Sequence, residues 1–253
     1  MKSLLKTVYI LYFQGNASSL PPRLPFLSPI LRILKQRAVT SNLPVKYVLV
    51  CCSYRGYWTS SGRPSEQGIA HDALASLQWI ATQATSSPTV PTPLIIWGQS
   101  IGAGVASTLS SSFPPSLSFP PSLSKSLPLK TLILETPFLS IHAMLQTLYP
   151  QKWLPYRYLW PFLRNHLDSE KALGVMSERW GERGEMTPKV WILQAGRDEL
   201  VPAGHAERLE GRCREVGVGG ALHTEVLVRA EGVRAVVEAV EEVAREGWEV
   251  EEV

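Results

Sequence analysis

A short motif flanked by glycines, Gly-Gln-Ser-Ile-Gly at positions 98–102, has the pattern G-x-S-x-G. It directly follows the apolar run 93–97 and directly precedes a helix-like stretch, so the serine is predicted on a strand-turn-helix. Such a turn exposes the serine hydroxyl at the carboxyl edge of a sheet, where it can attack an acyl carbonyl. The two glycines let strand and helix backbones pack closely around the turn. We predict that Ser100 is a nucleophile; the alternative is a glycine turn that carries an ordinary serine.

A serine nucleophile needs a base, and the base needs a carboxylate that orients it. Asp198 lies just after the apolar run 189–194, at a predicted strand end on the same sheet edge as Ser100. We therefore predict Asp198 as the acid. Its neighbour Glu199 is interpreted as a solvated loop carboxylate. Glu135, at the end of the preceding apolar run, stays open as an alternative acid.

Two histidines compete for the role of the base. His223 follows the weaker apolar run 214–218 and precedes the last helical pattern, so its loop can reach back to Ser100. His205 lies at the start of a predicted helix, where we expect a partly exposed side chain. The order serine, acid, histidine along the chain is the order of one known class of hydrolases. His223 is our predicted base.

Stabilising a tetrahedral oxyanion takes two backbone N–H donors beside the attacked carbonyl. The first is predicted to be the N–H of Ile101, the residue after the nucleophile. The second is predicted to come from the loop 14–17, where Gly15 permits close approach and Asn16 supplies the N–H. The alternative for this loop is an ordinary turn.

Six apolar runs alternate with helical patterns along the chain. The runs are nearly continuously apolar, as strands buried on both faces should be. They cover residues 7–13, 45–52, 93–97, 130–135, 189–194 and 214–218, and the helical patterns cover 66–84, 101–109, 203–213 and 232–243. This alternation predicts an α/β fold of about six parallel strands with helices on both faces.

Composition narrows the class of protein. The 253 residues are 45% hydrophobic and 19% charged, which favours a globular chain over a disordered one. The net charge of +3 is too small to indicate nucleic acid as a partner. Three cysteines without metal-ligand spacing predict neither a zinc site nor a disulfide framework, which favours an intracellular location. Residues 1–19 fit either a signal peptide or a core strand.

We expect a single domain over residues 1–253 with two unusual segments. Residues 113–118 and 119–124 repeat the sequence Phe-Pro-Pro-Ser-Leu-Ser, so 110–128 is predicted to be a disordered Pro/Ser-rich insertion. Residues 137–188 are rich in aromatic side chains. This region is interpreted either as a small cap over an apolar pocket or as ordinary packing.

Taken together, these motifs resemble the α/β-hydrolase superfamily, and more specifically its serine-aminopeptidase-like, monoacylglycerol-lipase-like branch of abhydrolase-domain proteins. The matching stretches are 12–17, 53–57 with 62–66, 97–102, 134–138, 196–202 and 222–223. The resemblance implies a serine hydrolase that cleaves carboxylic esters through an acyl-enzyme, with a small-molecule acyl substrate and no metal or cofactor. A peptidase or amidase of the same fold is the alternative, as is a catalytically weak protein that acts by binding a partner or a membrane.

Two features depart from the family pattern. Gln14 stands where the family usually has a histidine before the glycine of the loop. The family also usually has two further strands before residue 7, often with an N-terminal membrane anchor. We therefore expect membrane association only through such a missing anchor. We also expect an uncovered flank of the sheet beside strand 7–13, as in a fragment of a longer protein.

Overall fold

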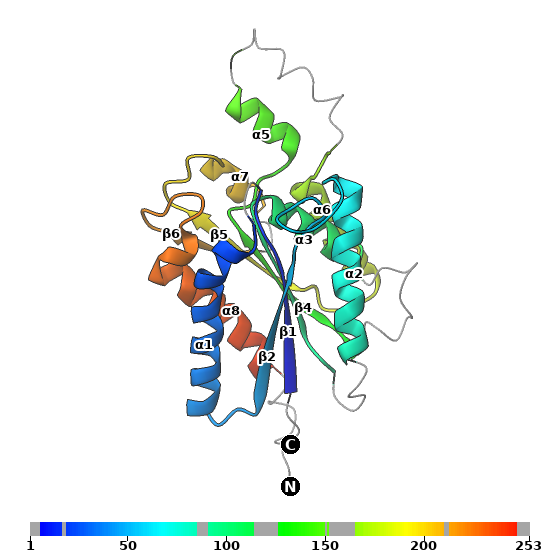
Figure 1. Cartoon of the computed structure of the whole chain (residues 1–253), viewed down its shortest axis with the longest axis vertical. Helices are drawn as coiled ribbons and strands as arrows, with labels where there is room; N and C mark the ends of the chain where they lie inside the picture. The colour runs from blue at the N-terminus through cyan, green and yellow to red at the C-terminus, as the bar shows by residue number, and fades with distance from the viewer. Residues whose placement is uncertain are drawn as a thin grey trace.

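A single parallel sheet organises the chain (Figure 1). The computed structural model describes residues 6–16, 19–84, 91–113, 126–149, 151, 165–209 and 213–246. Within them, six strands pair in the order β2-β1-β3-β4-β5-β6, all parallel. The strands are β1 (Lys6–Phe13), β2 (Val45–Cys52), β3 (Leu94–Gln99), β4 (Leu129–Glu135), β5 (Lys189–Ala195) and β6 (Cys213–Val218). Each predicted run is a strand, so the predicted α/β class is confirmed.

Both faces of the sheet are buried at the four inner strands β1, β3, β4 and β5, which explains why these strands read as nearly continuous apolar runs. In β1 the side chains of Ile10 and Tyr12 join one core cluster, and those of Leu11 and Phe13 join the other. The alternation follows from the two-residue period of a strand. The side chains of β1 therefore point alternately to the two faces of the sheet, and each face needs a layer of helices to cover it.

Helices supply those two layers. The helices are α1 (Leu24–Thr40), α2 (Glu66–Ala84), α3 (Ile101–Ser111), α5 (Ile141–Leu148), α6 (Ser169–Glu182), α7 (Ala203–Glu207) and α8 (Ala230–Arg245), with short 3-10 turns η1 (Pro21–Arg23) and η5 (Val226–Val228). Apolar side chains of α1 and α8 cover one face, and those of α2, α3 and α6 cover the other (Figure 1). No helix in the described ranges is both long and apolar enough to cross a membrane. The helix predicted over 203–213 is too long, because α7 ends at Glu207 and β6 already begins at Cys213.

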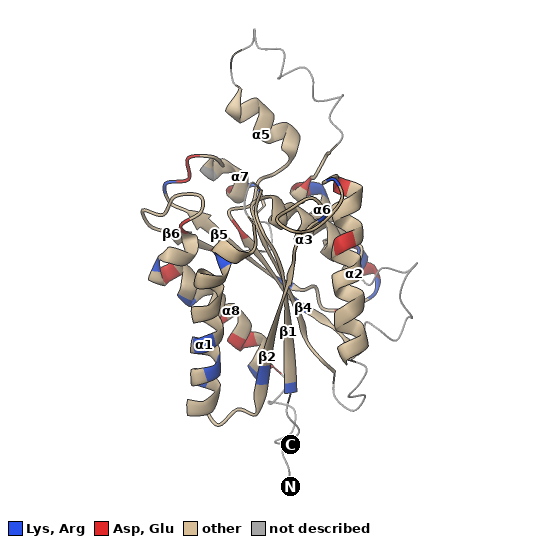
Figure 2. Ribbon diagram, viewed as in Figure 1, with Lys and Arg blue, Asp and Glu red and all other residues tan. Residues whose placement is uncertain are grey.

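The two helices on one face carry complementary charges (Figure 2). The charged side chains of α1 are all basic, whereas those of α8 are mostly acidic. Arg37 Nη1 of α1 lies 3.2 Å from Glu241 Oε2 of α8. Since Arg37 is about half exposed, this ion pair contributes at most about 1 kcal/mol.

The open flank of the sheet lies one strand farther out than expected. β1 is paired on both sides, with β2 and with β3. β2 is the outer strand, and most of its side chains are only partly buried. Beside Val48 and Val50, Trp79 of α2 is 50% exposed. The loop that follows β1 is therefore separated from the open edge by a complete strand.

The two unusual segments are partly within the described residues. α3 continues to Ser111, and Phe113 is fully buried with its ring stacked on Trp180 at a centroid distance of 6.4 Å. Residues 114–125, which hold most of the tandem repeat, lie outside the described residues, as do 150 and 152–164 of the aromatic-rich region. Phe138 and Trp180 of that region are buried in the core.

A close backbone crossing joins α3 to β1. A Cβ atom on Gly102 would overlap the carbonyl oxygen of Phe13, and one on Gly98 would overlap the carbonyl oxygen of Gly102. The prediction that these glycines let strand and helix pack tightly is confirmed. By contrast, a Cβ on Gly174 of α6 would meet nothing within 4 Å.

Gly102→Ala should lower the free energy of unfolding by about 1–3 kcal/mol, because backbone atoms must move apart to admit the methyl group. Gly174→Ala, the matched control, should raise it by roughly 0.5–1 kcal/mol, since alanine favours a helix interior. Urea unfolding curves of the two variants measure both effects. Equal midpoints for Gly102→Ala and the wild type would show that the crossing is looser than described.

Candidate active site

Ser100 occupies a strained turn at the carboxyl end of β3. Its backbone angles are φ 51° and ψ −115°, a conformation that non-glycine residues rarely adopt. The N–H of Ser100 donates a 2.8 Å hydrogen bond to the carbonyl of Glu135, at the end of the neighbouring strand β4. The side chain is partly exposed. Backbone strain of this kind concentrates at functional sites.

Asp198 and His223 form a buried pair. His223 Nδ1 lies 2.9 Å from Asp198 Oδ2 and 3.0 Å from Oδ1, and both side chains are 5% exposed. Asp198 Oδ1 also accepts the N–H groups of Leu200 at 2.9 Å and Val201 at 2.8 Å. The contact through Nδ1 leaves Nε2 of His223 for another partner. The two predicted residues, 25 positions apart, therefore meet as a unit.

The surroundings of Asp198 favour its ionised form. Burial alone would raise its pKa, but the hydrogen bonds from His223 and from the backbone of Val201 and Leu200 outweigh this. The pKa of Asp198 is consequently held below its ordinary value. A carboxylate that is charged at neutral pH can stabilise a positive imidazolium beside it.

Glu199 has a role that the sequence did not reveal. Its Oε2 accepts the backbone N–H of His223 at 3.0 Å. The side chains of consecutive residues, Asp198 and Glu199, thus hold the ring and the backbone of the same histidine. The only feature of the sequence that could have indicated this role is the position of Glu199 next to Asp198. That position is equally compatible with the solvated loop carboxylate that we expected.

Ser100 and the Asp198–His223 pair share one edge of the sheet. Ser100 follows β3, Asp198 follows β5 and His223 follows β6, and the three strands run in parallel. Among the described residues, no direct hydrogen bond joins Ser100 Oγ to His223. Ligand-free active sites often hold this contact at longer range and tighten it around substrate.

Glu135, the alternative acid, has a different partner. Its carboxylate oxygens accept hydrogen bonds of 2.9 and 3.0 Å from Arg23 Nη2. Arg23 Nε donates to the hydroxyl of Tyr12 at 3.0 Å. All three residues are buried, and the Glu135 side chain is fully so. Glu135 is therefore engaged by an arginine on the face of the sheet that α1 and α8 cover.

His205 is buried rather than partly exposed as expected. Its Nδ1 accepts the backbone N–H of Leu139 at 3.4 Å, so the ring supports the chain that follows β4. Burial, with a smaller effect from the charge of Arg208, lowers the pKa of His205. A neutral imidazole whose Nδ1 already has a backbone partner is suited to packing.

The two predicted oxyanion donors follow strands that are direct neighbours. Phe13 of β1 pairs in register with Gly98 of β3, and Asn16 and Ile101 each lie three residues beyond that pair. Asn16 is exposed, and its side-chain Oδ1 accepts the hydroxyl of Tyr57 at 2.7 Å. The register therefore brings the segments that carry both N–H groups to the same part of the sheet edge.

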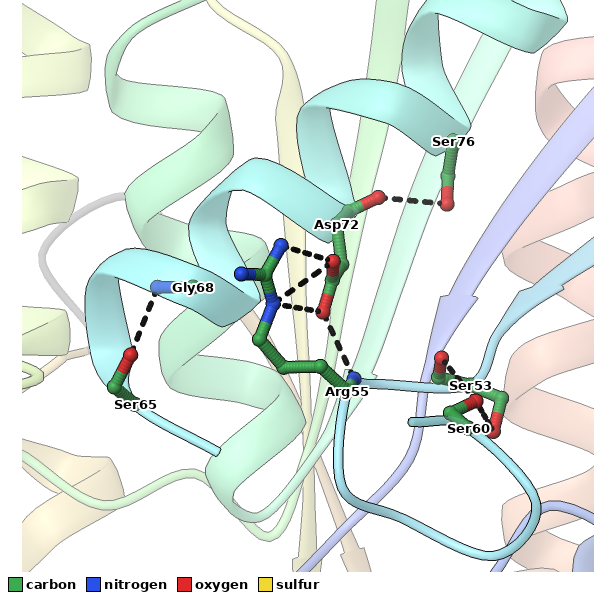
Figure 3. Close-up of polar contacts among 7 residues, drawn as sticks. All are labelled: Ser53, Arg55, Ser60, Ser65, Gly68, Asp72 and Ser76. Carbon is green, nitrogen blue, oxygen red and sulfur yellow. Dashed lines mark hydrogen bonds and ion pairs between the residues drawn. The ribbon is translucent and has the colours of Figure 1, made fainter. Parts of the chain in front are cut away.

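The loop after β2 supports the loop after β1. The hydroxyl of Tyr54 donates a 2.9 Å hydrogen bond to the carbonyl of Gln14. Three residues later, Tyr57 makes the contact with Asn16 described above. Between these tyrosines in the sequence, Arg55 reaches toward Asp72 of α2 (Figure 3). Its Nη2 lies 2.7 Å from Asp72 Oδ1, and its backbone N–H donates to Asp72 Oδ2 at 2.9 Å.

Short side-chain contacts complete this support (Figure 3). Ser65 Oγ accepts the N–H of Gly68 at 3.1 Å in the first turn of α2, and Ser60 Oγ donates to the carbonyl of Ser53 at 3.2 Å. The motif 53–57 thus has a structural meaning that sequence reasoning missed. Its arginine fixes the loop to α2, and its tyrosines hold Gln14 and Asn16.

An apolar cavity of about 360 Å³ lies between α2 and α3. Ala73, Leu74, Val105 and Leu109 are among the side chains that line it, and the predicted catalytic residues are not. In the part of the chain that the structure describes, no group of three or more His, Cys, Asp or Glu side chains is arranged to hold a metal ion.

Several curated proteins match the chain in sequence. Protein bem46 of Schizosaccharomyces pombe is 32% identical over 208 residues, which cover 81% of this chain and 56% of the relative. Lysophosphatidylserine lipase ABHD12 of Danio rerio is 34% identical over 156 residues, which cover 62% of this chain and 37% of the relative. The chain thus spans about half the length of the curated relatives it matches. No protein-family model matches it.

Solved structures share the fold at much lower identity. The esterase Pf2001 of Pyrococcus furiosus superposes with a TM-score of 0.60 at 16% identity, over 94% of this chain and 83% of that chain. Identity this low shows the fold alone, and that fold is the six-stranded parallel sheet with helices on both faces. The chain therefore has the α/β-hydrolase fold that these solved structures share, and its sequence is similar to those of the two curated relatives.

Proposed function

We propose that the chain is a serine hydrolase that cleaves carboxylic esters through an acyl-enzyme. Ser100 is the nucleophile, His223 the base and Asp198 the residue that orients His223. The observation that carries the proposal is the buried Asp198–His223 pair, with its 2.9 Å contact, at the sheet edge where Ser100 occupies a strained turn. A turn of this kind between strand and helix is the setting of a nucleophile elbow.

The reaction follows from the roles of these side chains. Ser100 Oγ attacks the ester carbonyl while His223 Nε2 takes the proton of the Ser100 hydroxyl. The bond between the carbonyl carbon and the leaving alcohol then breaks as His223 donates that proton to the alcohol oxygen. Water then attacks the acyl-enzyme with the same help from His223, which releases the acid and free Ser100. Asp198 stabilises the imidazolium in both halves, and the N–H groups of Ile101 and Asn16 stabilise the oxyanion.

Esters are the substrate class that the relatives favour. One sequence relative is named a lysophosphatidylserine lipase, and one structural neighbour is named an esterase. Both names describe enzymes that act on carboxylic esters. The substrate proposed for this chain is accordingly a small-molecule acyl ester. Peptidase or amidase activity and binding without turnover are outcomes that the experiment below distinguishes.

The purified chain should hydrolyse p-nitrophenyl esters and act on aminoacyl anilides much more slowly. A fluorophosphonate probe should label it, and Ser100→Ala should abolish both labelling and hydrolysis, because the attacking oxygen is gone. A series of acyl lengths, followed by absorbance, gives the preferred chain length. Ser107→Ala, a change on the same helix beyond the site, is the matched control and should retain the label.

Undiminished labelling of Ser100→Ala would overturn the nucleophile. Faster cleavage of anilides than of esters would replace the esterase by an amidase. A well-folded wild type that neither labels nor turns over any substrate would favour a protein that acts by binding.

His223→Ala should lower kcat by about 10³–10⁶-fold, as removal of the base does in related mechanisms. His205→Gln should change kcat little, because Nδ1 of His205 contacts the Leu139 backbone. Initial rates at saturating ester for the two variants make the comparison. A larger loss for His205→Gln than for His223→Ala would reverse the assignment of the base.

Asp198 should also leave a signature in the pH dependence of stability. Because its pKa in the folded state is lowered, its contribution is present above its unfolded pKa of about 3.8 and is lost as pH falls through the lower folded value. The difference in unfolding free energy between wild type and Asp198→Asn should therefore be present at about pH 5 and shrink below about pH 4. Urea unfolding at pH 5 and pH 3 measures it, and a difference that is larger at pH 3 than at pH 5 would contradict the pKa direction.

A further inference from the structure

We infer that Arg23 and Glu135 are positioning residues for the proposed esterase reaction: their buried ion pair holds the loop that carries Asn16 in register with the turn that carries Ser100. The inference rests on the proposed function, because it concerns the alignment of the oxyanion donors with the nucleophile. It concerns contacts that the reaction steps above do not use.

Arg23 fixes both ends of the loop after β1. Its guanidinium reaches back to the hydroxyl of Tyr12, which lies two residues before Gln14, at 3.0 Å. Arg23 itself ends η1, the turn into which the same loop runs. One side chain therefore links the strand before the loop to the turn after it.

Glu135 connects the same guanidinium to the nucleophile. Its carboxylate takes both hydrogen bonds from Arg23 Nη2, at 2.9 and 3.0 Å. Its backbone carbonyl accepts the N–H of Ser100 at 2.8 Å. A shift of Glu135 would move Ser100 and the start of α3, while a shift of Arg23 would move the loop with Asn16.

Burial makes this link specific. The Arg23 side chain is 6% exposed and that of Glu135 is 0%, so neither charge has water as an alternative partner. Burying two charges is costly, and such pairs can often be replaced by apolar side chains without loss of stability. What an apolar pair cannot reproduce is the set of directed, charge-assisted hydrogen bonds, in which Arg23 Nη2 bonds both oxygens of Glu135 while Nε bonds the Tyr12 hydroxyl.

This contrast supplies the test. The double variant Arg23→Met with Glu135→Leu removes both charges at similar volume and should keep the melting temperature near that of the wild type. Its kcat should fall by about 10- to 100-fold with KM changed less than about twofold, since small misplacements of reacting groups have effects of that size. Affinity for an aryl boronate, which mimics the tetrahedral state, should fall in parallel with kcat/KM.

The matched control removes a different ion pair, one between α1 and α8. Arg37→Met with Glu241→Leu alters the partly exposed contact between α1 and α8, far from the sheet edge, and should leave kcat, KM and boronate affinity unchanged. Tyr12→Phe is a milder probe that removes only the hydroxyl that accepts from Arg23 Nε. It should lower kcat in the same direction, by about threefold or more, with KM unchanged.

The outcomes separate the two proposals. If the double variant folds and retains kcat and boronate affinity within twofold, the positioning role is wrong while the esterase stands. If the double variant fails to fold, Tyr12→Phe decides, and an unchanged kcat there overturns the inference. If the wild type itself shows neither turnover nor fluorophosphonate labelling at Ser100, the proposed function fails instead.

Discussion

The close passage of α3 over the end of β1 is the constraint on which the geometry of the candidate site depends. Gly102 crosses the carbonyls of Phe13 and Gln14 with no room for a side chain. This contact places the first turn of α3 directly against the loop that follows β1. Ser100, which has a positive φ in the same turn, directly precedes Ile101, one of the two predicted oxyanion donors.

Much of the fold could be predicted because burial on both faces leaves a strong pattern in the strands. Even β6, whose side chains are largely exposed or half-buried, was found from its place in the alternation of strands and helices. The C-terminal end of α7 could not be predicted, since the local sequence favours a helix that continues beyond Glu207. The chain leaves that helix early because β6 must begin at Cys213 to pair with Val190 of β5. That constraint comes from the sheet and is invisible in a local window.

The candidate site divides in the same way. Ser100, Asp198 and His223 could be named because each follows a predicted strand, and parallel strands bring their carboxyl ends to one edge. The contacts that support them could not be named, because they join distant residues whose local sequence is unremarkable for the role. Arg23 reaches Glu135 across 112 positions, and Tyr54 reaches Gln14 across 40. The burial of His205 is a distant effect of the same kind. Its ring contacts the backbone of Leu139, 66 positions earlier, and the sequence around His205 indicates only a partly exposed helix residue.

The separation of Arg23 from Glu135 has a consequence for how the protein is made. A ribosome adds about 5–20 residues per second, so Glu135 is joined to the nascent chain roughly 6–22 s after Arg23. Throughout that interval the guanidinium of Arg23 has no carboxylate with which to form its buried ion pair. The loop that carries Asn16 then lacks one of the contacts that hold it in place. The N-terminal segment therefore has to wait, in a form that chaperones and proteases can reach, until the fourth strand has been synthesised and docked.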